Sequence, residues 1–177
     1  TKTAVATGAD LVAYSGFSNS NYLKQPYNSD LDFGTGDFSV TWWINPLTPT
    51  SDGVVQRRWG DTGYTYTGGW YDWLTTSLTY GWWGGNSGIV PLIQLQSSVW
   101  QCVCWVRRSG VLYAYLNGEL RSSGADGTNY QSDSVSAILQ IGTSAYNSGT
   151  RLALFRASAT APTAAQIKEI YEAEKPL

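Results

Sequence analysis

The chain has no histidine and no methionine, and among its 177 residues it has only two cysteines and four glutamates. Histidine is the side chain that most often serves as a general base, so its absence excludes a Ser-His-Asp triad. Two cysteines without histidine also fall short of the four ligands that a structural zinc ion usually takes. The composition therefore argues against an enzyme and against a zinc protein.

Charge of either sign is also scarce. The chain has 11 Lys and Arg residues against 13 Asp and Glu residues, which gives a net charge of −2 and a pI of about 4.9. Such a chain has no basic field that would attract nucleic acid or anionic lipid. No window approaches the roughly 18 consecutive apolar residues of a membrane-spanning helix. The sequence thus predicts neither a nucleic-acid partner nor insertion into a membrane.

The two cysteines, Cys102 and Cys104, stand two residues apart in one apolar run. On a strand this spacing places both side chains on the same face. A disulfide between them would strain the extended backbone. We therefore predict two reduced and buried thiols, as expected for a protein made in a reducing cytoplasm.

Strand and turn signals are abundant, and they are clearest over residues 100–121. Runs rich in Val, Leu, Trp and Tyr are separated there by Ser109-Gly110 and by Asn117-Gly118. Asn-Gly between apolar runs favours a tight hairpin, because a type I′ turn needs positive φ at both positions. The first run is apolar on both faces, which indicates a strand that is covered on both sides. This stretch is predicted to form the centre of a β-sandwich.

Two further segments complete the predicted fold. Phe38–Ile44 alternates apolar and polar residues except at Trp43, which we expect to pack against a second layer rather than to expose its ring to a ligand. Thr163 and Gln166 form a capping-box pattern, which predicts the start of a C-terminal helix that packs on the sandwich. The apolar side chains of that helix share one face: Ile167, Ile170 and Tyr171. The predicted fold class is all-β, a two-sheet antiparallel β-sandwich (jelly roll) with a short C-terminal helix.

These residues resemble a known family. A strand that begins at Trp100, then arginine, then a strand that ends in Tyr115-x-Asn117-Gly118 is similar to the laminin-G-like branch of the concanavalin A-like lectin/glucanase fold. Residues 29–44, 139–142 and 161–171 are similar to the flanking strands and the terminal helix of that family. The resemblance implies a concanavalin A-like domain over residues 21–177, with residues 1–20 as a linker or edge strand.

The C-terminal tail, which ends Glu174-Lys175-Pro176-Leu177, is most similar to copies of this domain in bacteriophage tail fibres and related virion proteins. This likeness implies a location on the virion, or otherwise outside the cell. It also implies a homo-oligomer, a trimer, in the full-length protein. The implied partner is a cell-surface glycan or polysaccharide.

The unusual part of the chain is the segment 57–86, where Trp and Tyr stand among Gly, Thr, Ser and Asp rather than among aliphatic residues. A flat ring can cover the C–H face of a sugar while nearby polar groups bind the hydroxyls. The rings predicted to stack on sugar are Trp59, Tyr64, Tyr66, Trp82 and Trp83. The polar side chains predicted to act beside them are Arg57, Arg58, Asp61 and Asp72.

A domain of this size also needs aromatic residues in its core, so about half of the rings in this segment are expected to be buried. Trp70 and Trp73 lie on opposite faces of a predicted strand, so one of the two should face the core. The rings that we expect to be exposed are flanked by glycine or small polar residues: Tyr64, Tyr66, Trp82 and Trp83.

The candidates for a metal site are Asp30, Asp32 and Asp37, and the ion would be calcium, since carboxylate oxygens are its preferred ligands. The alternative is a turn in which the Asp side chains bond local N–H groups. Many laminin-G-like domains bind calcium, but this chain has Ala153-Leu154 where that family often has an acidic pair. We expect no cofactor other than calcium, for which these three aspartates are the candidate ligands.

Three classes of function follow from these features. A glycosidase needs two carboxylates, which the glucanase branch carries as Glu-x-Asp-x-x-Glu on one strand. The glutamates of this chain stand instead beside a hairpin turn or in the predicted helix: Glu119, Glu169, Glu172 and Glu174. The sequence favours a non-catalytic, lectin-like domain for host-glycan recognition by a phage fibre or virion protein. The alternatives are a virion assembly domain with aromatics at subunit contacts and, less favoured, a polysaccharide-degrading enzyme.

Overall fold

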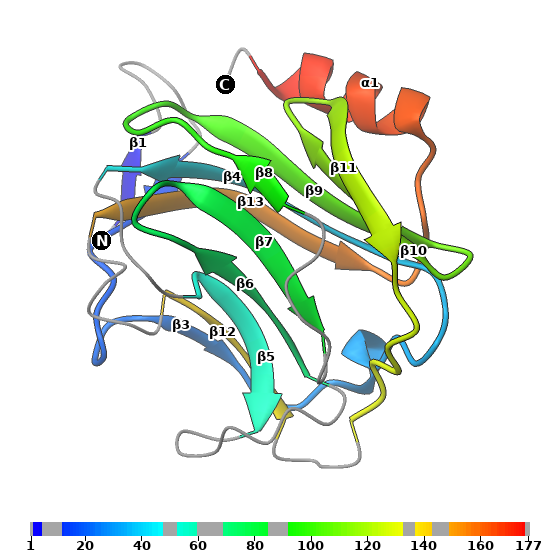
Figure 1. Cartoon of the computed structure of the whole chain (residues 1–177). Coiled ribbons are helices and arrows are strands. Elements are labelled where there is room, and N and C mark those ends of the chain that lie inside the picture. The colour runs from blue at the N-terminus through cyan, green and yellow to red at the C-terminus, as the bar shows by residue number, and fades with distance from the viewer. Residues whose placement is uncertain are drawn as a thin grey trace.

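The computed structural model describes residues 2–4, 12–47, 53–59, 69–84, 92–132, 137–142 and 149–175. Within these residues the strands form two sheets, and every strand pairing is antiparallel (Figure 1). The predicted class, a two-sheet β-sandwich with a short C-terminal helix, is confirmed.

The seven-stranded sheet has, in spatial order, β1 (Lys2–Ala4), β2 (Val12–Tyr14), β13 (Thr150–Ser158), β4 (Phe38–Pro46), β9 (Gln101–Arg108), β10 (Val111–Leu116) and β11 (Glu119–Ala125). The six-stranded sheet has β3 (Leu23–Gln25), β12 (Ala137–Ile141), β5 (Val55–Trp59), β6 (Trp70–Leu74), β7 (Thr79–Gly84) and β8 (Leu92–Gln94). The 3₁₀ helix η1 spans Ser29–Leu31, and the helix α1 spans Ala164–Glu174. Figure 1 shows α1 above the seven-stranded sheet, on the side away from the other sheet.

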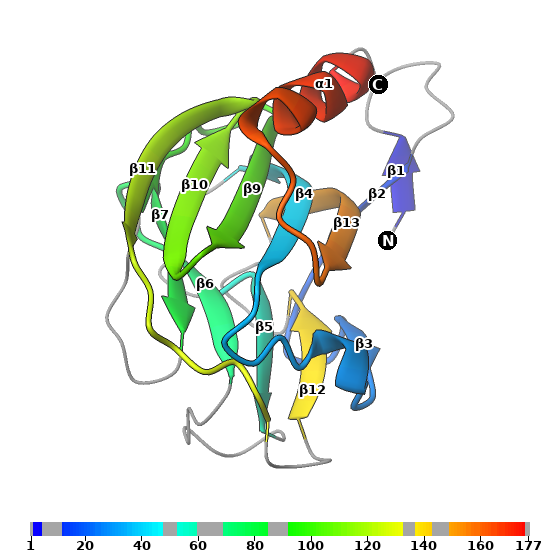
Figure 2. The same ribbon diagram turned by 90° about the vertical axis from the view of Figure 1, so that its right-hand side faces the viewer.

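The predicted central stretch forms the antiparallel strands β9, β10 and β11, which lie side by side in Figure 2. Asn117 and Gly118 have φ angles of 54° and 77°, as the predicted turn requires. Strand β9 has β4 on one side and β10 on the other, and its residues 101–107 are all buried. The prediction that this strand is central and covered on both faces is confirmed.

The main core lies between the two sheets and is rich in tryptophan. Side chains at alternate positions of β4 and β9 point into it, as the period of a strand requires. Four of its tryptophans have almost no exposed surface: Trp42, Trp70, Trp82 and Trp105.

The helix α1 packs on the outer face of the seven-stranded sheet. Thr163 and Gln166 form both hydrogen bonds of the predicted capping box. Ile167 is buried against Cys104, and the Tyr171 ring stacks on Trp43 with ring centroids 5.8 Å apart. The expectation that Trp43 packs against a second layer is therefore confirmed. Among the described residues, no helix has the length and apolar character that crossing a membrane would require.

Candidate functional site

The predicted sugar site falls on β5, β6 and β7 and on the segments between them. Asp61, Tyr64 and Tyr66 lie outside the described residues, as do the side chains of Arg58 and Trp59. Strand β5 pairs with β6, and β6 pairs with β7, so the remaining candidates come from adjoining strands.

The structure corrects the prediction for Trp82, which we expected to be exposed and which is 1% exposed. Its ring stacks on Trp70 with centroids 4.8 Å apart, and its Nε1 donates a hydrogen bond to the Tyr130 hydroxyl at 3.1 Å. Trp82 lies opposite Asp72 in the sheet, and both residues point into the sandwich. A ring in this position belongs to the core and has no face to offer a sugar.

Arg57 was predicted to bind a ligand, and it is also buried, with 0% of its surface exposed. Its guanidinium forms an ion pair with Asp32, whose side chain is itself 4% exposed. Asp32 further accepts hydrogen bonds from the Tyr27 hydroxyl at 2.8 Å and from the Ser132 backbone N–H at 3.2 Å. The hydrogen bond to Asp32 raises the pKa of Tyr27. Arg57 therefore joins β5 to the segment after η1 and is not available to a ligand.

Asp72 is the third correction, because it too is completely buried. Its carboxylate accepts a hydrogen bond from the Val55 backbone N–H at 2.9 Å and another from the Tyr80 hydroxyl. Burial, followed by the charge of Asp72, raises the pKa of Tyr80 well above its ordinary value. Asp72 thus holds the start of β5 against β6 and β7.

The three calcium candidates lie around the same end of the sandwich. Asp32 is engaged with Arg57, and Asp37 accepts a hydrogen bond from the Ser109 backbone N–H at 2.8 Å. Asp30 is an exposed residue of η1. Among the described residues, no group of three or more acidic, Cys or His side chains comes together to hold a metal. Calcium binding stays an untested prediction.

Three aromatic side chains lie on the outer face of the six-stranded sheet, and we call them the outer aromatic face: Tyr71, Trp73 and Trp83. Tyr71 pairs with Trp83 across the sheet, and their rings stack 5.6 Å apart at 17°. Trp73 meets Tyr71 edge-on at 6.1 Å. Trp73 and Trp83 are half-buried, whereas Trp70 is in the core, so the prediction that one of Trp70 and Trp73 faces inward is confirmed.

Polar groups adjoin the outer aromatic face. Gln56 lies beside Tyr71 in the sheet, and its Nε2 donates a hydrogen bond to Oε1 of Gln140 at 3.0 Å. Sequence reasoning missed this amide pair because the two residues are 84 positions apart. Gly81 lies opposite Trp73 and places no side chain beside its ring. Both amides are buried, so the outer aromatic face offers a sugar the partly exposed rings of Trp73 and Trp83.

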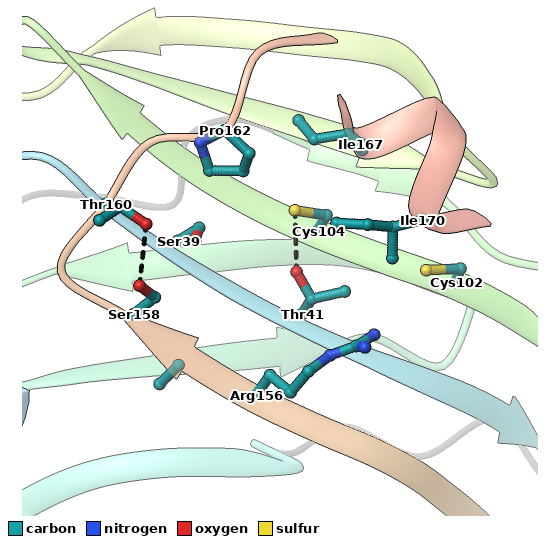
Figure 3. Close-up of a pocket in the computed structure, with 11 residues that line it drawn as sticks. Ser39, Thr41, Cys102, Cys104, Arg156, Ser158, Thr160, Pro162, Ile167 and Ile170 are labelled. Carbon is teal, nitrogen blue, oxygen red and sulfur yellow. Dashed lines mark hydrogen bonds between the residues drawn. The ribbon is translucent and has the colours of Figure 1, made fainter. Parts of the chain in front are cut away.

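A second candidate site lies on the outer face of the seven-stranded sheet, next to α1 (Figure 3). We call this cavity of about 230 Å³ the α1 pocket. Thr41 and the two thiols lie on the strands beneath it, and Arg156 of β13 lies at one side. The apolar side is formed by Pro162, Ile167 and Ile170. Its residues come from four separate segments, which is why the sequence alone gave no signal for it.

Cys102 and Cys104 border this pocket as free and buried thiols, as predicted. Burial raises the pKa of Cys102 from 9.0 to about 12 and that of Cys104 to about 11. Between pH 9.0 and about 11 the folded protein keeps these protons, whereas the unfolded chain loses them. The thiols therefore contribute stability below their ordinary pKa of 9.0, and this contribution is lost as the pH rises towards 11 and above.

We expect both thiols to resist iodoacetamide in the folded protein at about pH 8, because the thiolate is the reacting form. Mass spectrometry should find them unmodified under native conditions and both alkylated after denaturation without a reductant. Fast alkylation of the folded protein would contradict the burial, and no alkylation after denaturation would contradict the free thiols.

The comparisons with known proteins agree with this architecture. The sequence profile of the concanavalin A-like lectin/glucanases superfamily, in its laminin-G-like form, matches residues 17–168. The chain belongs to this superfamily, as the resemblance implied. A comparison with curated protein sequences gave no significant match.

Several solved structures share the fold. The binding domain of Paraclostridial Mosquitocidal Protein 1 superposes with a TM-score of 0.72 at 14% identity, over 98% of this chain and 45% of that one. The receptor binding domain of botulinum neurotoxin D gives 0.72 at 13% identity, over 98% and 46%. Trypanosoma rangeli sialidase gives 0.65 at 9% identity, over 94% and 28%. This chain spans less than half of each, and at such identities the likeness shows the fold alone.

Proposed function

We propose that this domain is a lectin-like module that binds a glycan without cleaving it, through the outer aromatic face. The observation that carries the proposal is the Tyr71–Trp83 stack with Trp73 beside it, three rings on the outside of a sheet. Rings in this position are not needed to fill the core between the sheets. The superfamily is named for its lectins and glucanases, and two similar structures are described as binding domains of toxins, which supports a binding role.

Trp73 and Trp83 are the rings of the outer aromatic face that can touch a sugar, because Tyr71 is only 7% exposed and supports Trp83 from beside it. Trp73 and Trp83 are half-buried, so each ring can keep one side fixed by its neighbours and offer the other to the C–H face of a sugar. Gln56 and Gln140 are buried and bonded to each other, so they fix the strands beside the rings rather than bind the sugar. Affinity per site will be low, because each sugar hydroxyl exchanges a hydrogen bond with water for one with protein.

The biological setting that we propose is host recognition by a phage fibre or virion protein. The basis is the likeness of the C-terminal tail to such proteins. A trimeric fibre would carry several copies of this weak site, and simultaneous binding of several copies would supply strong attachment. The class of glycan would then be a polysaccharide or oligosaccharide of the host surface.

The test is a glycan array with the domain displayed in many copies. We expect binding to at least one glycan, and we expect Trp73→Ala and Trp83→Ala each to weaken it about tenfold, as the loss of one aromatic contact would. Trp100→Ala is the matched control, since this half-buried tryptophan packs at the seven-stranded sheet instead.

Two results would overturn the proposal. Normal glycan binding by both variants would exclude the outer aromatic face, and release of reducing sugar from a bound glycan would indicate an enzyme. An assembly domain would be favoured by two results together. The wild type would bind no glycan, and Trp83→Ala would change the oligomeric state of the longer protein.

A further inference from the structure

Strand β13 contains a bulge next to the α1 pocket. Ala153 pairs with Trp43 of β4, but the next pair along the strands is Arg156 with Thr41, so β13 has one extra residue here. Leu154 within the bulge has a φ of 51°, in the left-handed region that a non-glycine residue rarely adopts. Bulges and strained residues of this kind are often found where a side chain is redirected towards a site.

The bulge determines which side chain reaches the pocket. Without the extra residue, Phe155 would lie opposite Thr41 on the outer face. With it, Phe155 packs towards the core, where its ring centroid is 6.0 Å from that of Trp42. Arg156 takes the outer position in its place and borders the α1 pocket. The extra residue of the bulge therefore places a guanidinium where an aromatic ring would otherwise lie.

One hydroxyl in the pocket is left without a partner. Ser39 is 9% exposed, and its hydroxyl makes no hydrogen bond within the part of the chain that the structure describes. The Thr41 hydroxyl, by contrast, donates to Sγ of Cys104 at 3.0 Å. This hydroxyl is not among the side-chain atoms that are fully buried without a partner, so it is open to the pocket, where a ligand can replace water as its partner.

Arg156 also keeps donors free. Its two terminal nitrogens donate hydrogen bonds to the two carboxylate oxygens of Glu174, and the distance from Nη2 to Oε2 is 2.9 Å. A guanidinium has five N–H groups, and the Nε–H of Arg156 donates to no group among the described residues. Arg156 and Glu174 together are neutral, and the buried thiols are protonated, so the pocket carries no net charge.

The opposite side of the pocket is apolar. Ile170 of α1 is 38% exposed although it faces the cavity, and Ile167 and Pro162 continue this side. The pocket thus has hydroxyls and a guanidinium on one side and aliphatic carbon on the other. Its volume of about 230 Å³ is below the range of about 300–1,000 Å³ typical of pockets for drug-sized ligands.

From these features we infer that the α1 pocket binds one neutral sugar ring, or a cyclic polyol of similar size. The C–H face of the ring lies against Ile170, and its hydroxyls bond Ser39 and the free N–H groups of Arg156. A neutral ligand matches the neutral pocket, and a single ring matches its volume. This site lies on the other sheet from the outer aromatic face, so it does not depend on the function proposed above.

The test is a titration of the ¹⁵N-labelled domain with methyl glycosides of neutral hexoses and with myo-inositol, followed by NMR. We expect saturable shifts at the amides of Thr41, Cys104 and Ile170, with dissociation constants in the millimolar range. Ser39→Ala should weaken this binding about threefold to tenfold. It should leave the melting temperature nearly unchanged, because this hydroxyl makes no hydrogen bond to the described residues.

Ile170→Trp is the second variant, since this exposed position accepts a larger side chain that fills the pocket, and it should abolish the shifts. Trp83→Ala is the control and should leave them unchanged. The inference is overturned if no compound shifts the pocket amides, or if Ser39→Ala and Ile170→Trp bind like the wild type.

Discussion

Replacement of Trp82 by alanine is expected to lower the free energy of unfolding by about 3–5 kcal/mol, the usual cost of deleting a large buried aromatic side chain. Trp82 is 1% exposed, stacks on Trp70 and donates a hydrogen bond to Tyr130. Trp83, the next residue, lies on the outer face, so Trp83→Ala leaves no cavity between the sheets. It should cost far less stability and should instead weaken glycan binding.

Chemical denaturation of the two variants measures this difference, because the same residue type is removed from opposite faces of one strand. The m-value should stay constant, which shows that stability and not the extent of unfolding has changed. Equal losses of stability for Trp82→Ala and Trp83→Ala would contradict the placement of the two rings. So would a Trp82→Ala variant that loses glycan binding and keeps its stability.

The second large effect is expected for Asp32→Ala, which should cost about 3–5 kcal/mol because it leaves the buried Arg57 without its counter-ion. Both side chains of this ion pair are almost completely buried. The Nε and one terminal nitrogen of Arg57 already lack hydrogen-bond partners in the described residues. The guanidinium would therefore remain charged in an environment where few groups solvate it.

A matched control comes from an exposed ion pair of the same fold. Lys168 and Glu119 join α1 to β11 with more than half of each side chain exposed, so Glu119→Ala should have a small effect. The double variant Asp32→Asn with Arg57→Met should recover part of the loss, because no charge stays buried and Asn keeps an acceptor oxygen for the Tyr27 hydroxyl or the Ser132 N–H. If Asp32→Ala is no more costly than Glu119→Ala in urea denaturation, the pair does not hold η1 to the sheet.

Local features of this protein followed from the sequence. The turn at Asn117 and Gly118 was predictable because few residues adopt positive φ there. The start of α1 was predictable because Thr163 and Gln166 satisfy each other's backbone groups over three positions. The alternation of Phe38–Ile44 showed which side chains of β4 point into the core. In each case the interaction that decides the structure lies within a few residues along the chain.

The functional surface depended on contacts that are distant in the sequence. The glycines beside Trp82 and Trp83 suggested exposed rings, but at Gly84 the Tyr130 ring packs so closely that a side chain would collide with it. Local sequence preferences do not decide which face of β7 turns inward, because each face carries a tryptophan. The partners Trp70 and Tyr130, 12 and 48 residues away, decide that Trp82 is core and Trp83 is surface.

Contacts that are distant in the sequence also decide why the predicted polar ligands do not line a site. Arg57 and Asp72 carry the right chemistry for sugar, but both are buried, Arg57 paired with Asp32 after η1 and Asp72 bonded to the Val55 N–H of β5. The α1 pocket arises because one extra residue in β13 places Arg156 opposite Thr41. The sequence by itself determined the strands, the turns and the helix, since these depend on neighbours along the chain. Only the packing of two sheets and a helix decided which side chains face a ligand, because that choice depends on residues brought together from across the fold.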